Sequence, residues 1–149
     1  MNKIYLLLLM MLAAQIGCAK ESTRTTADTS PVKEKLIRRA AVERVYFPFD
    51  SDSMIVEAAD GIDQNIRWMA ENRNAYIILE GHCDEVGLGE YNMFLGDRRA
   101  RAVKAYMIEK GVSPEKIVMI ISYGSTRPLN PGHRIVDLRE NRRVEFVIR

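Results

Sequence analysis

From Val42 onward, the apolar residues follow two alternating kinds of spacing, and this alternation most limits what the chain can fold into. Segments with alternating or continuous apolar residues are typical of strands. These segments are 44–49, 76–81, 117–122 and 144–148. Apolar residues at three- and four-residue steps are typical of amphipathic helices, and they occur at 55–72 and 92–110. Strands that alternate with helices predict an α/β sandwich with at least one parallel crossover.

Turn and cap signals separate these segments. Residues 51–53 (Ser-Asp-Ser) offer N-cap chemistry for the first helix, and Gly111 closes the second. A loop at 124–137, with two prolines, precedes the last strand. The predicted order is therefore β-α-β-α-β-loop-β, without an internal repeat.

The first seventeen residues have the features of a secretory signal peptide. Lys3 precedes an apolar run at 4–14, which is too short for a lone membrane-spanning helix, since a span needs about 20 residues. A buried core helix is the alternative interpretation, but no amphipathic partner segment follows the run.

This segment ends in Gly17-Cys18, which resembles the bacterial lipobox, although Gln15 stands where that motif prefers leucine. The resemblance implies that Cys18 is acylated and becomes the first residue of the mature protein. Ala19 after the cysteine implies the outer membrane, with the protein on its periplasmic face. Two or three acyl chains would anchor the chain firmly.

Three regions follow from this composition. Residues 1–17 are predicted to be a lipoprotein signal peptide, and 18–41 a lipidated N-terminus and flexible linker, because that stretch is polar and has no aromatic residue. Residues 42–149 are predicted to form the folded domain. If Cys18 carries lipid, Cys83 is the remaining cysteine and no intramolecular disulfide is possible.

The charge and motif content exclude several function classes. With 22 basic and 20 acidic residues, the formal net charge is +2, which gives little attraction to nucleic acid. The sequence contains no Walker loop, GxGxxG or CxxC motif, so nucleotide, dinucleotide and dithiol chemistry lack their usual signals. We therefore expect no cofactor.

The second predicted helix carries a charge on its apolar face. Projected at about 100° per residue, Arg99 lies on the same face as Leu95 and Val103. A guanidinium there is costly unless it meets a carboxylate or lies at a pocket. Asn92 lies on the same face, where its side chain can cap the helix or contact a ligand.

Acidic residues follow two of the predicted strands. Asp84 and Glu85 come after the strand at 76–81, and Asp50 comes after the first strand. In open α/β sheets, ligands usually bind at the carboxyl ends of the strands. If the two strands are parallel neighbours, Asp50 and Asp84 open onto one crevice. With Arg99, this crevice would suit a zwitterion, unless Asp84 and Arg99 form a purely structural ion pair.

These residues belong to a longer series of motifs. The series is Phe47-Pro48-Phe49-Asp50, Gly81-His82-Cys83-Asp84-Glu85, Tyr91-Asn92, Leu95-Gly96, Arg98-Arg99-Ala100, Ser122-Tyr123-Gly124 and Asn141-Arg142-Arg143. It resembles the OmpA-like peptidoglycan-binding domain family, and within it the branch of peptidoglycan-associated lipoproteins (Pal). The resemblance covers about 42–149, and its most specific part is 81–100.

The resemblance implies a two-layer α/β sandwich of OmpA-like type with a mixed sheet, and a domain that is not an enzyme. The implied ligand is the peptidoglycan stem peptide, above all its diaminopimelate, held non-covalently. The implied binding residues are Phe49, Asp50, Asp84, Asn92, Leu95 and Arg99. Where the family usually has Arg-Gly-Thr, this chain has Val86-Gly87-Leu88.

The resemblance further implies a tether between the outer membrane and the cell wall, as in the Tol-Pal system. A TolB-like periplasmic β-propeller protein is an implied partner. The alternative function is a periplasmic protein-interaction module, in which an Asp84–Arg99 pair is structural.

Catalytic and metal-binding interpretations are disfavoured. His82-Cys83 suggests a cysteine hydrolase, but neighbouring strand residues point to opposite faces and are poorly placed to pair. Glu80, His82 and Asp84 alternate and could hold a metal, with His133 joining them, although such spacing recurs by chance. We therefore expect no metal site and no catalytic residue.

Overall fold

The computed structural model describes residues 42–149, so the predicted signal peptide and linker lie outside the described residues. The strands of this region are β1 (Val45–Tyr46), β2 (Ile77–His82), β3 (Ile117–Gly124) and β4 (Arg143–Ile148). Its α-helices are α3 (Val56–Glu71), α4 (Gly89–Glu109) and α5 (Ile135–Asn141), and a 3-10 turn, η1 (Pro114–Lys116), precedes β3. No helix between residues 42 and 149 has the length and apolarity to cross a membrane.

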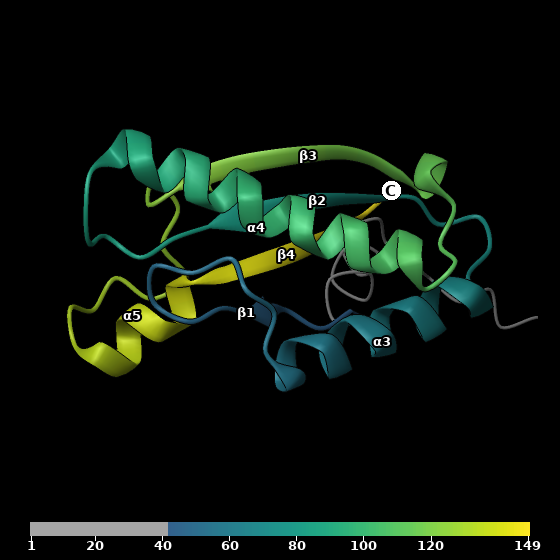
Figure 1. The fold of residues 1–149 in the computed structure, drawn as a ribbon, viewed down its shortest axis with the longest axis horizontal. Helices are drawn as coiled ribbons and strands as arrows, with labels where there is room; N and C mark the ends of the chain where they lie inside the picture. Colours follow the sequence, from purple (N-terminus) through teal and green to yellow (C-terminus); the bar gives the residue numbers. More distant parts are fainter. Residues whose placement is uncertain (1–41) are drawn as a thin grey trace, which may run out of the picture.

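The four strands form one mixed sheet in the order β1-β4-β2-β3. β2 and β3 are parallel and are joined by α4, while β4 runs antiparallel to both β1 and β2 (Figure 1). The predicted mixed α/β sheet and parallel crossover are therefore confirmed. However, β1 and β2 are not neighbours, because the last strand of the chain lies between them.

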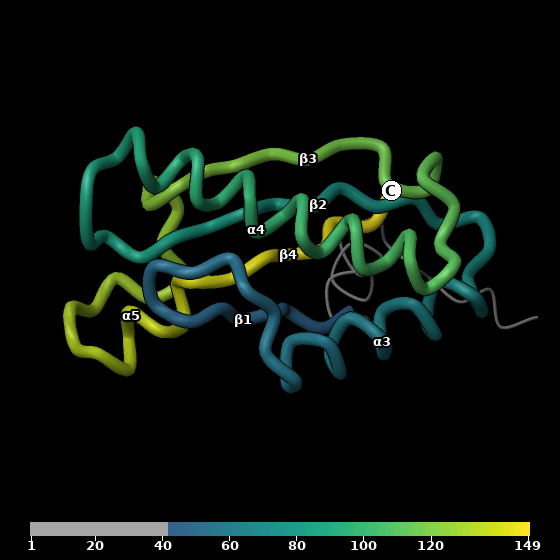
Figure 2. Tube along the Cα trace, viewed as in Figure 1, coloured from purple at the N-terminus to yellow at the C-terminus, as the bar shows by residue number. Residues whose placement is uncertain are grey.

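Helices α3 and α4 lie side by side on one face of this sheet, as the trace in Figure 2 also shows. The hydrophobic core lies between the two layers. Its buried members are Val45, Phe47, Ala58, Ile62, Met69, Ile77, Leu79, Ala100, Val103, Met107, Ile117, Val144 and Phe146. The predicted apolar face of α4 is confirmed, because Leu95, Gly96, Arg99 and Val103 are all buried.

Two glycines allow α4 to lie directly on the end of β2. A Cβ atom at Gly81 would overlap the backbone carbonyl of Gly96, and one at Gly96 would meet the Ser122 hydroxyl. The helix therefore crosses the strand with almost no side chain between them. Asn92 and Arg99 lie about one turn to either side of this contact, so both are brought to the carboxyl end of β2.

The first strand and the start of the first helix differ from the prediction. The Phe47 N–H still donates to the Arg142 carbonyl (2.8 Å), but Pro48 has no N–H to continue the ladder. Instead of capping a helix, the Ser51 hydroxyl accepts a hydrogen bond from the Ser53 N–H (3.0 Å), which makes a local turn. Helix α3 begins only after Ile55.

The predicted loop at 124–137 contains the start of α5, which the sequence did not reveal because seven residues are too few for a periodic pattern. Asn141, at the end of α5, ties this region together. Its amide oxygen accepts hydrogen bonds from the Leu129 and Asn130 N–H groups (2.7 and 2.9 Å), and its amide nitrogen donates to the Asn130 carbonyl (2.7 Å). These contacts fix the start of β4.

We expect Gly81→Ala to destabilise the domain by about 3 kcal/mol, because its methyl group would collide with backbone rather than with a movable side chain. Gly89→Ala, in the first turn of α4, is the matched control, since a Cβ there has no neighbour within 4 Å. Its stability should equal or slightly exceed that of the parent protein. Urea unfolding measures both variants, and equal midpoints for the two would contradict the close helix–strand contact.

Candidate functional site

A pocket of about 180 Å³ opens where β2 ends, between the loop after β1 and the first turns of α4. All six residues predicted to bind a ligand line it. They are Phe49, Asp50, Asp84, Asn92, Leu95 and Arg99. Val86, Gly87, Tyr91, Cys83 and Arg142 complete the lining. The structure thus brings together residues from four separate parts of the chain.

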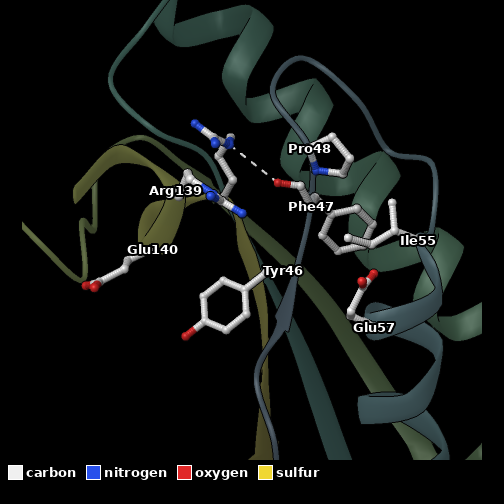
Figure 3. A pocket seen from close by; sticks show the side chains of 8 residues that line it. Tyr46, Phe47, Pro48, Ile55, Glu57, Arg139 and Glu140 are labelled. Carbon is white, nitrogen blue, oxygen red and sulfur yellow. Dashed lines mark hydrogen bonds between the residues drawn. The ribbon is translucent and has the colours of Figure 1, made fainter. Parts of the chain in front are cut away.

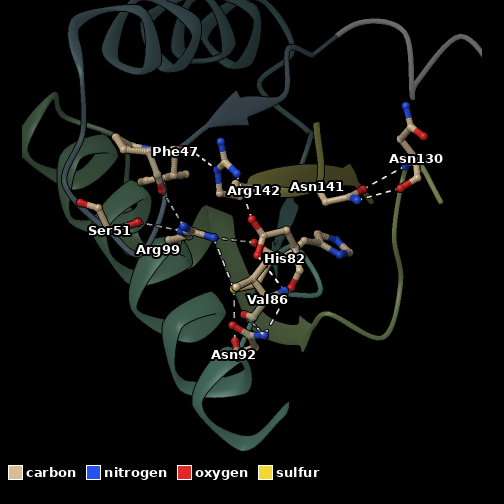
Figure 4. Close-up of polar contacts among 12 residues, drawn as sticks. Phe47, Ser51, His82, Val86, Asn92, Arg99, Asn130, Asn141 and Arg142 are labelled. Atoms are coloured by element: carbon tan, nitrogen blue, oxygen red, sulfur yellow. Dashed lines mark hydrogen bonds and ion pairs between the residues drawn. The ribbon is translucent and has the colours of Figure 1, made fainter. Parts of the chain in front are cut away.

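Arg99 forms the floor of this pocket and is fully buried. Its guanidinium donates hydrogen bonds to the carbonyls of Ser51 (2.8 Å), His82 (3.0 Å) and Pro48 (2.9 Å), as Figure 4 shows in part. A further bond goes to the Cys83 Sγ (3.3 Å). Burial lowers the pKa of Arg99, yet a guanidinium remains charged at any physiological pH. Arg99 therefore joins α4, β2 and the loop after β1.

Asp84 does not pair with Arg99. Its carboxylate instead forms a buried ion pair with Arg142 (2.9 Å), the residue that directly precedes β4. It also accepts a hydrogen bond from the Val86 N–H (3.2 Å). The suggested Asp84–Arg99 ion pair is therefore wrong. The physical reason is the sheet order, which inserts β4 between β1 and β2 and delivers a second arginine to Asp84.

Asn92 is buried and fixes the loop that follows β2. Its amide nitrogen donates to the carbonyls of Asp84 (3.3 Å) and Val86 (3.0 Å). It lies inside α4 and not at the cap, because the helix starts at Gly89. Its role in the described structure is to hold the loop at 84–86 against the helix.

Asp50 lines the pocket from the loop after β1 and is exposed. Its carboxylate accepts a short hydrogen bond from the Tyr91 hydroxyl (2.5 Å). Asp50 is also the only non-glycine residue with positive φ (48°) among residues 42–149. The pocket thus contains two carboxylates and two guanidinium groups.

A larger groove, of about 450 Å³, lies beside β1 (Figure 3). Tyr46, Phe47, Ile55 and Arg139 are among the residues that line it, and Arg142 reaches it from the pocket side. None of the six predicted ligand-binding residues lines this groove. We therefore place the candidate site in the smaller pocket.

Comparison with known proteins identifies the family of this fold. A model of the OmpA family matches residues 46–142. The chain belongs to the OmpA family. The resemblance found in the sequence motifs is thereby confirmed.

Relatives of this OmpA-family chain include the peptidoglycan-associated lipoproteins of Pseudomonas putida and Mesorhizobium japonicum. The first is 39% identical over 123 residues, which cover 80% of this chain and 73% of the relative. The second is 31% identical over 151 residues, which cover 95% of this chain and 89% of the relative.

Solved structures agree with this assignment. The crystal structure of the peptidoglycan-associated lipoprotein from Burkholderia pseudomallei has a TM-score of 0.66 and 29% identity, covering 83% of this chain and 98% of that one. The C-terminal domain of Helicobacter pylori MotB has the same TM-score at 24% identity, covering 72% and 84%. The MotB likeness concerns the fold alone.

The sequence prediction left out five residues of the OmpA-family pocket, and two of them, Arg142 and Tyr91, bind its carboxylates through their side chains. Both stand in the motif series, in Asn141-Arg142-Arg143 and Tyr91-Asn92, but neither was given a role. Arg142 could have been found only with the strand order, which apolar spacing does not encode. Tyr91 could have been found from its place one residue before Asn92, in the first turns of α4.

The geometry does not favour the two catalytic alternatives. The Cys83 thiol donates to the Asn92 carbonyl (3.3 Å) and is buried, and burial raises its pKa. A raised pKa disfavours the reactive thiolate. Among residues 42–149, no group of three side chains is placed to hold a metal ion. His133, the fourth suggested ligand, contacts Glu85 instead (2.6 Å).

His82 is a buried imidazole at the end of β2, 2% exposed. Its ring lies against that of Tyr123, with centroids 5.5 Å apart, and neither ring nitrogen has a hydrogen-bond partner within the described region. Burial, with the nearby charge of Arg143, lowers its pKa from 6.5 to about 4, while Glu145 opposes the shift. His82 is therefore neutral in the folded domain at neutral pH.

Acid should destabilise the domain through His82. Because its pKa is lower in the folded state, its contribution to stability is complete above pH 6.5 and is lost as the pH falls toward 4. The gap from 6.5 to about 4 corresponds to about 3 kcal/mol. Urea unfolding at several pH values measures this loss. In His82→Phe the loss of stability in acid should be smaller by about 3 kcal/mol. In His133→Gln, which changes an exposed histidine, the loss should be the same as in the parent protein.

The same pH slope in His82→Phe and in the parent protein would show that the acid sensitivity arises elsewhere.

Proposed function

We propose that the OmpA-family domain binds the zwitterionic end of a peptidoglycan stem peptide, centred on its diaminopimelate, without catalysing a reaction. The observation that carries this proposal is the charge pattern of the pocket: two arginines and two aspartates, Arg99, Arg142, Asp50 and Asp84, that sum to zero. A zwitterion of matching geometry would be complementary to such a pocket. The names of the relatives, peptidoglycan-associated lipoproteins, agree with this ligand.

Hydrogen-bond capacity assigns the carboxylate of the ligand to the arginine side. A guanidinium has five N–H donors. Arg142 uses Nε on the Phe47 carbonyl (3.4 Å) and Nη1 on Asp84, which leaves Nη2 without a protein partner in the described region. Arg99 uses all but one of its donors on backbone and Cys83. We therefore expect the carboxylate between Arg142 and Arg99, with Arg142 as the main donor.

The same argument assigns the ammonium group to Asp50. Asp84 is already occupied by Arg142 and the Val86 N–H. Among residues 42–149, Asp50 has one side-chain partner, Tyr91, and it is exposed. Asn92 keeps its amide oxygen for the peptide backbone of the ligand, while Phe49 and Leu95 supply apolar contact beside the polar groups.

A second candidate function is protein interaction, and the groove beside β1 favours it. The groove is lined by apolar residues such as Ile55 and Phe47 together with the charged Arg139 and Glu57. Aromatic residues and arginine are enriched at surfaces that bind proteins, and Tyr46, Phe47, Arg139 and Arg142 are among the residues that line this groove. A TolB-like β-propeller protein is the partner that we propose for this role. Binding of purified protein to isolated sacculi without any partner distinguishes the two functions.

Sacculus binding tests the main proposal. Arg142→Lys should weaken co-sedimentation with sacculi at least about tenfold, because lysine cannot hold both Asp84 and a carboxylate in planar geometry. Arg99→Lys should lower both binding and stability, since three carbonyls lose their donors. Arg101→Lys is the matched control, because Arg101 is exposed and pairs with Asp97 outside the pocket. If Arg142→Lys stays folded and sediments like the parent protein, the proposed site is wrong.

We further propose that the mature chain is an outer-membrane lipoprotein anchored through Cys18, which lies outside the described residues. With the domain bound to peptidoglycan, the anchor would tether the outer membrane to the cell wall. Cys18→Ser should release folded protein into the soluble periplasmic fraction. Mass spectrometry of the parent N-terminus should find acyl chains on Cys18, and an unmodified N-terminus would refute the anchor.

A further inference from the structure

The turn at residues 48–51, within the loop between β1 and α3, forms one wall of the pocket, and α4 holds both ends of this turn. Arg99 donates to the Pro48 carbonyl at one end and to the Ser51 carbonyl at the other. Phe49 and Asp50 are left at the apex of the loop. Fixed ends alone do not determine where the apex carboxylate points, so a further contact must orient it.

The backbone conformation of Asp50 is a second reason why its carboxylate needs a contact that orients it. Its φ of 48° lies in the left-handed region, which costs an L-residue energy, although aspartate tolerates it better than most. An exposed carboxylate on such a turn would rotate freely about its side-chain torsions. The structure fixes it through one side-chain hydrogen bond, from the Tyr91 hydroxyl (2.5 Å).

Tyr91 is itself held in place by its neighbour on α4. The Arg98 guanidinium lies over the Tyr91 ring, 5.8 Å from the ring centroid. Arg98 also pairs with Asp52 of the same loop (3.3 Å). Although Arg98 is exposed, it supports the Tyr91–Asp50 contact from both sides. A chain of contacts thus joins α4 to this loop, and we call it the loop latch. It consists of Arg98, Tyr91, Asp50 and Asp52.

We infer that Tyr91 is a positioning residue, which orients the Asp50 carboxylate toward the amine of a ligand in the pocket. The inference rests on the proposed function. The hydroxyl donates to Oδ1 of Asp50 and leaves Oδ2 for the ligand. A tyrosine hydroxyl donates without adding a positive charge at neutral pH, so it leaves the carboxylate able to attract a cation. A lysine or arginine there would instead neutralise Asp50.

The loop latch therefore acts on one part of the ligand only. The carboxylate end of the ligand lies with Arg142 and Arg99, which Tyr91 does not contact in the structure. Once a ligand excludes water from the pocket mouth, the Tyr91–Asp50 hydrogen bond strengthens. The geometry predicts that Tyr91 selects for a free ammonium group and is indifferent to a neutral acylated one.

Calorimetric titration of the full-length protein in detergent tests this inference with two probes. One is a disaccharide tripeptide ending in diaminopimelate with its free side-chain amine, and the other is the same compound with that amine acetylated. The parent protein should prefer the free amine. Tyr91→Phe should weaken binding of the free amine about tenfold, and of the acetylated compound less than about twofold. Asp50→Asn should abolish the preference, and adding Tyr91→Phe to it should have no further effect.

Tyr46→Phe is the matched control. Tyr46 is 41% exposed, as Tyr91 is, but its hydroxyl has no hydrogen bond in the described region and faces the groove beside β1. The Tyr46→Phe variant should bind both probes with the affinity of the parent protein. Equal losses for both probes in Tyr91→Phe would show a merely structural role, and no loss or a gain would also overturn the inference.

The same titrations separate the inference from the function on which it rests. Equal binding of both probes by the parent protein would overturn the role of Tyr91 and the assignment of the ammonium group to Asp50, while peptidoglycan binding as such would stand. Binding of neither probe would overturn both.

Discussion

The structure depends on a buried cation that is satisfied by backbone carbonyls. Arg99 is fully buried on the core face of α4, and its nearest acceptors are the carbonyls of Pro48, Ser51 and His82. Desolvating a guanidinium is costly, and hydrogen bonds from a charged donor are among the strongest that can offset that cost. Since these carbonyls belong to two segments, the loop after β1 and the end of β2, the charge can be satisfied only when both segments meet α4. One side chain therefore couples the packing of the core to the shape of the pocket.

The polar groups of the pocket follow from where this contact places the chain. Gly81 and Gly96 let α4 lie directly on the end of β2, so that Arg99 reaches the loop after β1. β4 lies between β1 and β2, and Arg142, directly before the start of β4, forms an ion pair with Asp84. The two arginines are thus held by different partners. Arg99 donates mainly to backbone carbonyls and holds α4, β2 and the loop after β1 together. Arg142 pairs with Asp84 and keeps its Nη2 donors for a ligand at the pocket surface.

Much of the fold was predictable because the chain repeats simple apolar spacings. The apolar stripe of α4 and the strand at 117–122 are each long enough for periodicity to emerge, and the structure contains both. The errors occur where elements are short. β1 has two paired residues, and its end is set by Pro48 and by its pairing with β4. Helix α5 has seven residues and depends on tertiary contacts around Asn141.

The sequence by itself determined the class of the domain and six of the residues that line the pocket. Apolar spacing defines helices and strands locally, and the motif series from Phe47 to Arg143 is specific enough to indicate the OmpA family. Only the tertiary structure decided which charges meet. Asp84 pairs with Arg142, 58 residues away, and not with Arg99. Strand order sets such pairings, and it arises from the packing of the whole sheet, which no local pattern of residues encodes.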